Sequence, residues 1–322
     1  WWSSPQGVAL VAGRAALRLG TAAAVLAGCS VAAVILLQRK ILYFPQTATV
    51  PPPPARLKAP YNQIEDVEVT CEDGVRIKLW HWVAPTAEEL RATRGTFVSE
   101  RNAAARRRTT LLMFHGNAGS RMDRAQWLYQ LRLLLGVGVA MVDYRGYGGS
   151  QGEPTEEGLK RDARAALRWL RETKSPDGLV LVGESIGTCV ALALAAEEEE
   201  RDGAGAFDAI VLNAALTSIT EVAAHTFPIM RPFLKSCLWD RWDSLGRIHK
   251  VTAPLLFLHG PRDNIVPIEL GRKLHAAANE PKTWVEIPRG DHNSLPFMGG
   301  ELYYGAIDTL LADHVDRPSI SS

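Results

Sequence analysis

The chain has 322 residues, a formal net charge of +1, and a composition that is 47% hydrophobic. This length and composition suit one large α/β domain, alone or with an accessory segment. The near-neutral charge gives no chain-wide field that would attract nucleic acid, so we expect no nucleic-acid partner. The four cysteines show neither the pair spacing of a disulfide framework nor that of a zinc site.

Residues 19–37 form an uncharged apolar run, with two arginines shortly before it and Arg39 and Lys40 after it. As a helix this run is about 28 Å long, close to the thickness of a bilayer's hydrocarbon core. We therefore predict a single-pass transmembrane anchor at 19–37, after an N-terminal tail at 1–18. Its flanking charges slightly favour a cytosolic C-terminal side and do not indicate which membrane. A cleaved signal or transit peptide and a lipoprotein modified at Cys29 are the alternatives.

A proline-rich linker is predicted at 38–60, followed by an α/β domain at 61–314 and a short tail at 315–322. The segments 64–71 and 75–83 flank a turn and predict an antiparallel hairpin. The strand candidates that follow are continuously apolar, which indicates burial on both faces of a mostly parallel, eight-stranded sheet with helices on both faces. These candidates lie at 110–116, 137–146, 178–185, 209–216, 254–260 and 284–288. Helical periodicity fits 120–135, 155–172, 186–198, 267–278 and 300–313.

Two segments interrupt this alternation of strands and helices. Residues 86–108 are polar and charged, and we interpret them as a solvated surface insertion; a patch that binds anionic lipid at Arg106–Arg108 is the alternative. Residues 217–253 are long for a connection between adjacent strands, which is typical of a helical lid insertion. We predict that its aromatic residues Phe227, Phe233 and Trp239 bind substrate, unless they only pack the insertion onto the domain.

The sequence GESIG at 183–187 places Ser185 between an apolar strand and an alanine-rich helix. Such a tight strand–turn–helix bend strains the serine backbone and exposes its hydroxyl at the C-terminal edge of the sheet. The glycines on either side leave room for neighbouring backbone. The backbone N–H of Ile186, at the helix N-terminus, then points to where an oxyanion would form.

A nucleophilic serine of this kind needs an acid and a histidine later in the chain. Asp263 follows the strand candidate at 254–260, and His292 follows the strand candidate at 284–288. We predict that His292 is the general base and that Asp263 fixes its tautomer and stabilises its charged form. Asp291 is the alternative acid.

The second oxyanion donor is expected in the loop after the strand candidate at 110–116, at the N–H of Asn117 or of Ala118. His115, in the same loop, is expected to hold it by bonding to backbone. The chain lacks clustered ligand motifs such as H-E-x-x-H, so we predict no metal. The glycine-rich stretch 143–152 lacks the G-K-[ST] of a phosphate loop, so no cofactor is expected and Arg145 is assigned structural hydrogen bonds.

Several of these stretches together resemble the membrane-anchored alpha/beta hydrolase domain-containing proteins of the Bem46-like group. They are LYFP (42–45), HGNAGS (115–120), DYRGYGGSQGEPTEEGL (143–159), GESIG, HGPRDNIVP (259–267) and GDHNS (290–294). The resemblance covers 41–311 and implies the α/β-hydrolase fold, no cofactor, and a nucleophile, acid and base at Ser185, Asp263 and His292. The segment 86–108 is longer than the family's loop, which puts surface recognition in doubt.

The predicted function is a membrane-tethered serine hydrolase of long-chain acyl esters or thioesters, acting on lipids or on lipidated proteins. A prolyl-oligopeptidase-type peptidase shares the fold and the triad, but the chain has no repeat domain to gate peptides. A non-catalytic membrane-bound scaffold on a hydrolase fold is the third hypothesis. Haloalkane dehalogenase chemistry is disfavoured, because it needs a carboxylate where Ser185 stands.

Overall fold

The structure is a computed structural model that describes residues 21, 35–45, 51–93 and 100–316. The chain divides into two compact units, Trp1–Leu42 and Tyr43–Ser322. Most of the anchor predicted at 19–37 lies outside the described residues. The described stretch 35–42, at and after its end, is helical. Within the described ranges, no helix combines the length and the apolar character that crossing a membrane requires.

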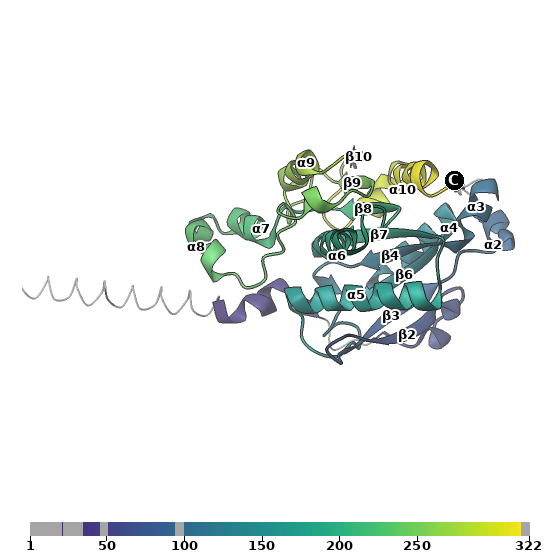
Figure 1. The fold of residues 1–322 in the computed structure, drawn as a ribbon, viewed down its shortest axis with the longest axis horizontal. Helices are drawn as coiled ribbons and strands as arrows, with labels where there is room; N and C mark the ends of the chain where they lie inside the picture. Colours follow the sequence, from purple (N-terminus) through teal and green to yellow (C-terminus); the bar gives the residue numbers. More distant parts are fainter. Residues whose placement is uncertain (1–20, 22–34, 46–50, 94–99, 317–322) are drawn as a thin grey trace, which may run out of the picture. The chain divides into compact units, whose positions relative to one another are not determined.

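The second unit is built on an eight-stranded sheet with the order β10-β9-β8-β7-β4-β6-β3-β2 (Figure 1). Its strands are β2 (Glu65–Thr70), β3 (Arg76–Trp82), β4 (Thr109–Phe114), β6 (Gly138–Asp143), β7 (Gly178–Glu184), β8 (Ala209–Asn213), β9 (Leu255–His259) and β10 (Lys282–Glu286). The pairs β2–β3 and β3–β6 are antiparallel and all other pairs are parallel. Every residue of β4, β6, β8 and β9 is buried. The predicted hairpin and mostly parallel sheet are confirmed.

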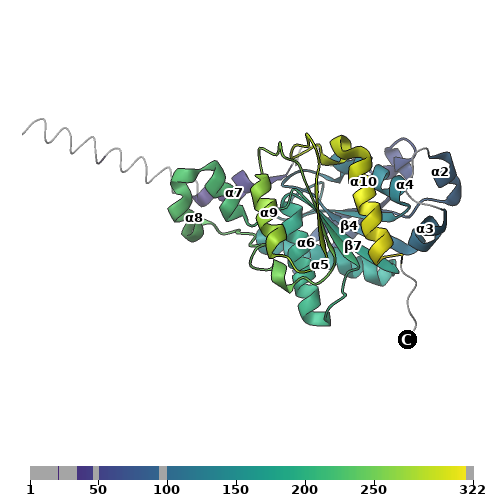
Figure 2. The same cartoon turned by 90° about the horizontal axis from the view of Figure 1, so that it is seen from above.

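Five helices cover the two faces of this sheet: α4 (Ala125–Leu135), α5 (Glu156–Thr173), α6 (Ile186–Asp202), α9 (Ile268–Ala277) and α10 (Leu295–His314). Helix α5 packs on α6, and α4 packs on α10, with β4 and β7 between the two pairs (Figure 2). Helix α5 shows how the sequence sets these positions. The Thr155 hydroxyl accepts the N–H of Gly158 as its N-cap, and apolar residues such as Leu159, Ala163 and Leu170 recur on its buried face.

The prediction of a solvated surface insertion at 86–108 is only partly correct, because Ala103 and Arg106 are buried. The segment contains the short helices α2 (Ala87–Ala92) and α3 (Glu100–Ala105) and a 3-10 turn at Arg106–Arg108. Arg106 is fully buried: its guanidinium bonds to Asp308 and Asp316 at 2.5 and 2.7 Å and to the carbonyl of Leu135. Arg106 therefore cannot belong to a lipid-binding patch, because its guanidinium is already paired with Asp308 and Asp316.

We expect Arg106→Ala to lower the free energy of unfolding by about 3 kcal/mol, because it leaves two carboxylates without their buried cation. The effect should lie at the low end for a buried pair, since Asp308 keeps 23% of its side chain exposed. Thermal or urea unfolding measures it. The control Arg107→Ala, at an exposed neighbour, should change the free energy of unfolding by less than about 0.5 kcal/mol. Equal effects of the two variants would contradict the ion-pair explanation.

The insertion at 217–253 is helical in its first half, with α7 (Ile219–Thr226), a 3-10 turn at Pro228–Met230 and α8 (Arg231–Cys237). Its second half returns to the domain. The backbone N–H groups of Arg241 and Trp242 donate to the carboxylate of Glu156, the first residue of α5, and the Trp242 ring is fully buried.

The segment interpreted as a linker at 38–60 is not a plain spacer. Tyr43 is buried, and the strand β1 (Phe44–Pro45) pairs in parallel with β5 (Ala118–Gly119). The second unit thus begins at Tyr43 rather than at residue 61.

Candidate active site

Ser185 lies at the sharp turn between β7 and α6, with φ 54° and ψ −121°. A positive φ is strained for a residue with a side chain, so the surrounding packing must hold it there. A Cβ at Gly187 would come within 2.0 Å of the Phe114 carbonyl oxygen, and one at Gly183 within 2.5 Å of Thr188 Cα. Both glycines are therefore required by close approach of backbone, and they permit the bend that presents the hydroxyl.

The structure brings Ser185, His292 and Asp263 into one hydrogen-bonded chain. His292 Nε2 lies 3.0 Å from Ser185 Oγ, and His292 Nδ1 lies 2.7 Å from Asp263 Oδ2. The three side chains come from β7, from the loop after β10 and from the loop after β9, which all end at the same edge of the parallel sheet. In this geometry the imidazole can accept the hydroxyl proton while the carboxylate holds its Nδ1–H.

Asp263 is held ionised by its surroundings. Burial alone would raise the pKa of Asp263, but hydrogen bonds with His259 and His292 outweigh it and hold that pKa well below its usual range. Its Oδ1 also accepts the N–H groups of Ile265 and Val266 at 2.9 and 2.8 Å. The alternative acid, Asp291, is exposed and accepts the N–H of Asn293 instead. The carboxylate that meets His292 is that of Asp263.

His259 is a buried neighbour of this acid that was not predicted from the sequence as a site residue. Its Nε2 lies 3.4 Å from Asp263 Oδ2 and 3.0 Å from the carbonyl oxygen of Val266. The signal was available, because His259 stands four residues before Asp263 at the end of β9.

Two backbone donors are candidates for the oxyanion hole, and both adjoin Ser185. The N–H of Ile186 opens α6, where no intrahelical acceptor exists. Asn117 follows Gly116, whose Cβ position would lie 3.5 Å from Ser185 Cβ. His115 supports this loop as expected: burial lowers the pKa of its ring to about 3, and its Nδ1 donates to the Gly116 carbonyl at 2.7 Å.

A cleft of about 230 Å³ opens beside His292. Its lining is Asp123, Arg124, Trp127, Glu184, Asn213, His292, Asn293, Leu295, Pro296 and Phe297. The residues predicted to bind substrate are not among these: Phe227, Phe233 and Trp239 lie on the insertion with 55%, 59% and 51% of their surface exposed. The cleft wall was not predicted, because Leu295–Phe297, at the start of α10, resemble ordinary core residues in sequence.

An ion pair at the cleft was also missed. Arg124 bonds to Glu184 through Nε at 2.9 Å and Nη2 at 3.1 Å, and its Nη1 donates to the Ala118 carbonyl. Burial would raise the pKa of Glu184, but the charge of Arg124 outweighs it and lowers that pKa. Because Glu184 precedes Ser185, this pair joins the nucleophile turn to the loop after β4.

Comparison with known proteins places this geometry in a family. Residues 109–239 match the family profile of the alpha/beta hydrolase fold. The alpha/beta hydrolase domain-containing protein WAV2 of Arabidopsis thaliana is 30% identical over 309 residues, which cover 90% of this chain and 91% of WAV2. The chain belongs to the alpha/beta hydrolase family. Protein bem46 of Schizosaccharomyces pombe matches this hydrolase at 33% identity, over 64% of the chain and 68% of bem46.

One further relative of the hydrolase, and one solved structure with a similar fold, carry names that state an activity. The lysophosphatidylserine lipase ABHD12 of Danio rerio is 31% identical over 69% of the chain, which spans 60% of ABHD12. The esterase Pf2001 of Pyrococcus furiosus has a similar fold, with a TM-score of 0.60 and 19% identity over 85% of this chain and 98% of the esterase. The predicted α/β-hydrolase fold with a mostly parallel sheet is confirmed, and so is the resemblance to Bem46 relatives.

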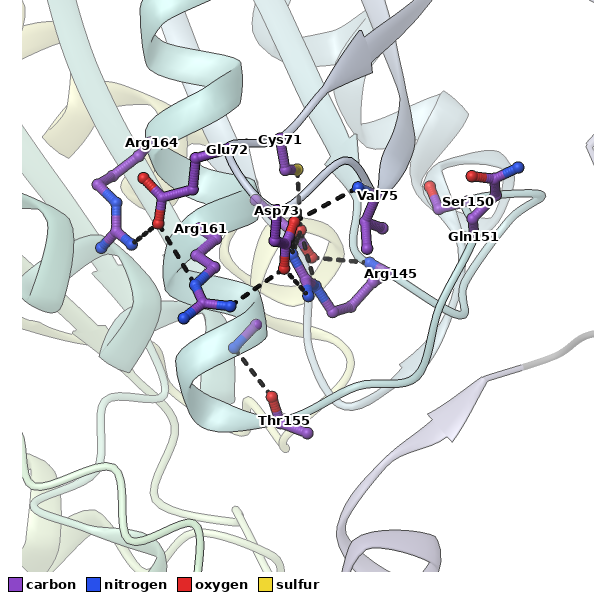
Figure 3. A network of polar contacts seen from close by, with 12 residues as sticks. Cys71, Glu72, Asp73, Val75, Arg145, Ser150, Gln151, Thr155, Arg161 and Arg164 are labelled. Atoms are coloured by element: carbon purple, nitrogen blue, oxygen red, sulfur yellow. Dashed lines mark hydrogen bonds and ion pairs between the residues drawn. The ribbon is translucent and has the colours of Figure 1, made fainter.

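The side chains of Arg145, Cys71 and Cys189 are not among those that line the cleft. Arg145 bonds to Asp73 and Asp162 at 2.8 and 2.9 Å in a network beside the glycine-rich loop (Figure 3), which confirms its structural assignment. Burial raises the pKa of the Cys71 and Cys189 thiols to about 12, so neither is a competing nucleophile. Within the part of the chain that the structure describes, no group of three or more His, Cys, Asp or Glu side chains is placed to hold a metal ion.

Proposed function

We propose that this alpha/beta hydrolase is a membrane-anchored serine hydrolase that cleaves long-chain acyl esters or thioesters of lipids or lipidated proteins. The observation that carries the proposal is the hydrogen-bonded chain from Ser185 Oγ through His292 to Asp263. Such a chain of contacts at a sharp strand–helix turn is what acyl transfer requires.

The reaction consists of two acyl transfers, the first to Ser185 and the second to water. In the first, His292 Nε2 takes the proton of Ser185, and Ser185 Oγ bonds to the substrate carbonyl carbon. The carbonyl oxygen becomes an oxyanion that the N–H groups of Ile186 and Asn117 stabilise. The imidazolium then gives its proton to the departing alcohol or thiol. Water repeats the sequence on the acyl-enzyme, with His292 again as base, and releases the carboxylic acid.

The cleft supports an acyl substrate with a polar part. Trp127, Leu295 and Phe297 give it an apolar side suited to a hydrocarbon chain, while Asp123, Arg124 and Asn293 give it a polar side. One relative is named a lysophosphatidylserine lipase, which supports ester chemistry. Anchoring by residues 19–37 would keep the enzyme at the surface that holds such substrates and raise its local concentration there.

A fluorophosphonate probe tests the proposal directly, because it reacts only with an activated serine. We expect the full chain in detergent to be labelled, Ser185→Ala to lose the label, and the control Ser175→Ala, at an exposed serine beyond α5, to keep it. Turnover of p-nitrophenyl and thioester substrates of increasing acyl length then measures preference. An unlabelled wild type, or a labelled Ser185→Ala, would overturn the proposal.

A further inference from the structure

The short strand β1 lies against the loop that carries the candidate oxyanion donor Asn117. Phe44 pairs with Ala118 and Pro45 pairs with Gly119. The backbone N–H of Phe44 donates to the carbonyl of Asn117 at 2.9 Å, and the Tyr147 hydroxyl donates to the same oxygen at 2.8 Å. A segment far away in sequence thus shares an edge with the loop beside Ser185.

Four consecutive carbonyls of this loop are held by donors from its surroundings. Those of residues 115 to 118 accept, in order, from the Tyr144 hydroxyl, the His115 ring, the Phe44 N–H with the Tyr147 hydroxyl, and the Arg124 guanidinium. In a trans peptide the C=O and the following N–H point in opposite directions. Fixing the carbonyl at 116 therefore fixes the direction of the Asn117 N–H. Fixing the carbonyl at 117 fixes the direction of the Ala118 N–H, the alternative donor of this loop, and anchors Asn117 on its C-terminal side.

Strand β1 is itself fixed at the residue before Phe44. Tyr43 is only 2% exposed, and its hydroxyl accepts the indole N–H of Trp242 at 3.0 Å. Trp242 is in turn held by Glu156 at the start of α5. The Phe44 side chain is half exposed, so this residue contributes to the loop chiefly through its backbone.

We propose that Tyr43–Pro45 is a positioning element of the oxyanion hole, acting through the Asn117 carbonyl, and this inference rests on the function proposed above. By fixing the 117–118 peptide it anchors Asn117 on its C-terminal side, and so steadies the Asn117 N–H while negative charge develops on the substrate oxygen. Preorganised donors of this kind stabilise the transition state more than the bound substrate. Loosening β1 should therefore lower kcat and leave KM nearly unchanged.

The test compares two substitutions at one residue in the full chain. Phe44→Pro removes the N–H that donates to Asn117, whereas the matched control Phe44→Ala keeps this N–H and removes only the side chain. Losing a whole oxyanion donor lowers kcat by about 10²–10³-fold, and displacing one should cost less. We therefore expect Phe44→Pro to lower kcat of p-nitrophenyl butyrate hydrolysis about 10-fold. KM should stay within about twofold, and the inhibition constant of a trifluoromethyl ketone should rise about as much as kcat falls. Phe44→Ala should behave as the wild type.

The outcomes separate this inference from the proposed function. If the wild type shows no turnover, the proposed function fails; if the wild type is active and Phe44→Pro matches Phe44→Ala, the positioning role fails. Should Phe44→Pro not fold, Tyr43→Phe tests the same element, since it removes the acceptor of the Trp242 N–H. It should lower kcat about threefold at constant KM, and Trp242→Phe should add nothing to it. Additive losses, or a change in KM alone, would overturn the proposal.

Discussion

Replacing His292 with alanine is expected to lower kcat for ester hydrolysis by roughly 10⁶-fold, as when a member of an interdependent triad is removed. His292 Nε2 is the base that lies 3.0 Å from Ser185 Oγ. Without it the serine proton has no acceptor in the attack, and the leaving group has no acid to protonate it. Stopped and continuous assays with a p-nitrophenyl ester measure kcat, and thermal unfolding checks that the variant is folded.

A matched control and a chemical rescue sharpen this prediction. His249→Ala, at an exposed histidine near the end of the insertion, should retain wild-type kcat. Added imidazole should restore part of the activity of His292→Ala, because it can occupy the space of the missing ring and accept the proton. Near-wild-type activity in His292→Ala would show that another group serves as base.

The nucleophile turn could be predicted from sequence because local rules determine it. GESIG between an apolar run and an alanine-rich run permits only a tight bend, and the close contacts at Gly183 and Gly187 show why other residues do not fit. The acid and base followed from order along the chain, since parallel strands bring their C-terminal ends to one edge. The contact between these distant side chains could thus be predicted, because strand direction alone brings the strand ends together.

The cleft and its charges were not predictable in the same way. Which side chains line the cleft depends on how α10 packs on α4, and neither helix signals its partner in sequence. Arg106 shows the same limit: in an arginine-rich segment it has the sequence surroundings of a solvated cation. Its acidic partners, Asp308 and Asp316, lie about 200 residues away, so only tertiary packing reveals its burial.

The pairing of β1 with the loop after β4 was missed for a different reason. A two-residue strand is too short to show an alternating pattern of apolar and polar residues. In addition, LYFP next to an apolar run is typical of chain that leaves a membrane interface. Its role is visible only in the bonds from Phe44 to Asn117 and from Trp242 to Tyr43. The bond from Phe44 to Asn117 joins backbone groups, so side-chain identity does not encode it.

Replacing Asp263 with asparagine should lower kcat by roughly 10⁴-fold while the site keeps its shape. The carboxylate accepts from His292 Nδ1 at 2.7 Å, which leaves Nε2 free of hydrogen and facing Ser185. An asparagine amide can donate to Nδ1 instead, which favours the tautomer with hydrogen on Nε2. That ring cannot take the serine proton, and the imidazolium formed later loses its counter-charge. The control Asp291→Asn, at the exposed neighbouring acid, should retain activity.

The same variant makes a prediction for stability against pH. The pKa of Asp263 is lower in the folded protein than the value of about 3.9 in an unfolded chain. A group with a depressed folded pKa stabilises the native state above its unfolded pKa, and this stabilisation is lost as pH falls through the folded pKa. The difference in unfolding free energy between wild type and Asp263→Asn should thus be constant near neutrality and shrink below about pH 4. A difference that grows on acidification, or wild-type kcat in Asp263→Asn, would show that this carboxylate does not serve His292.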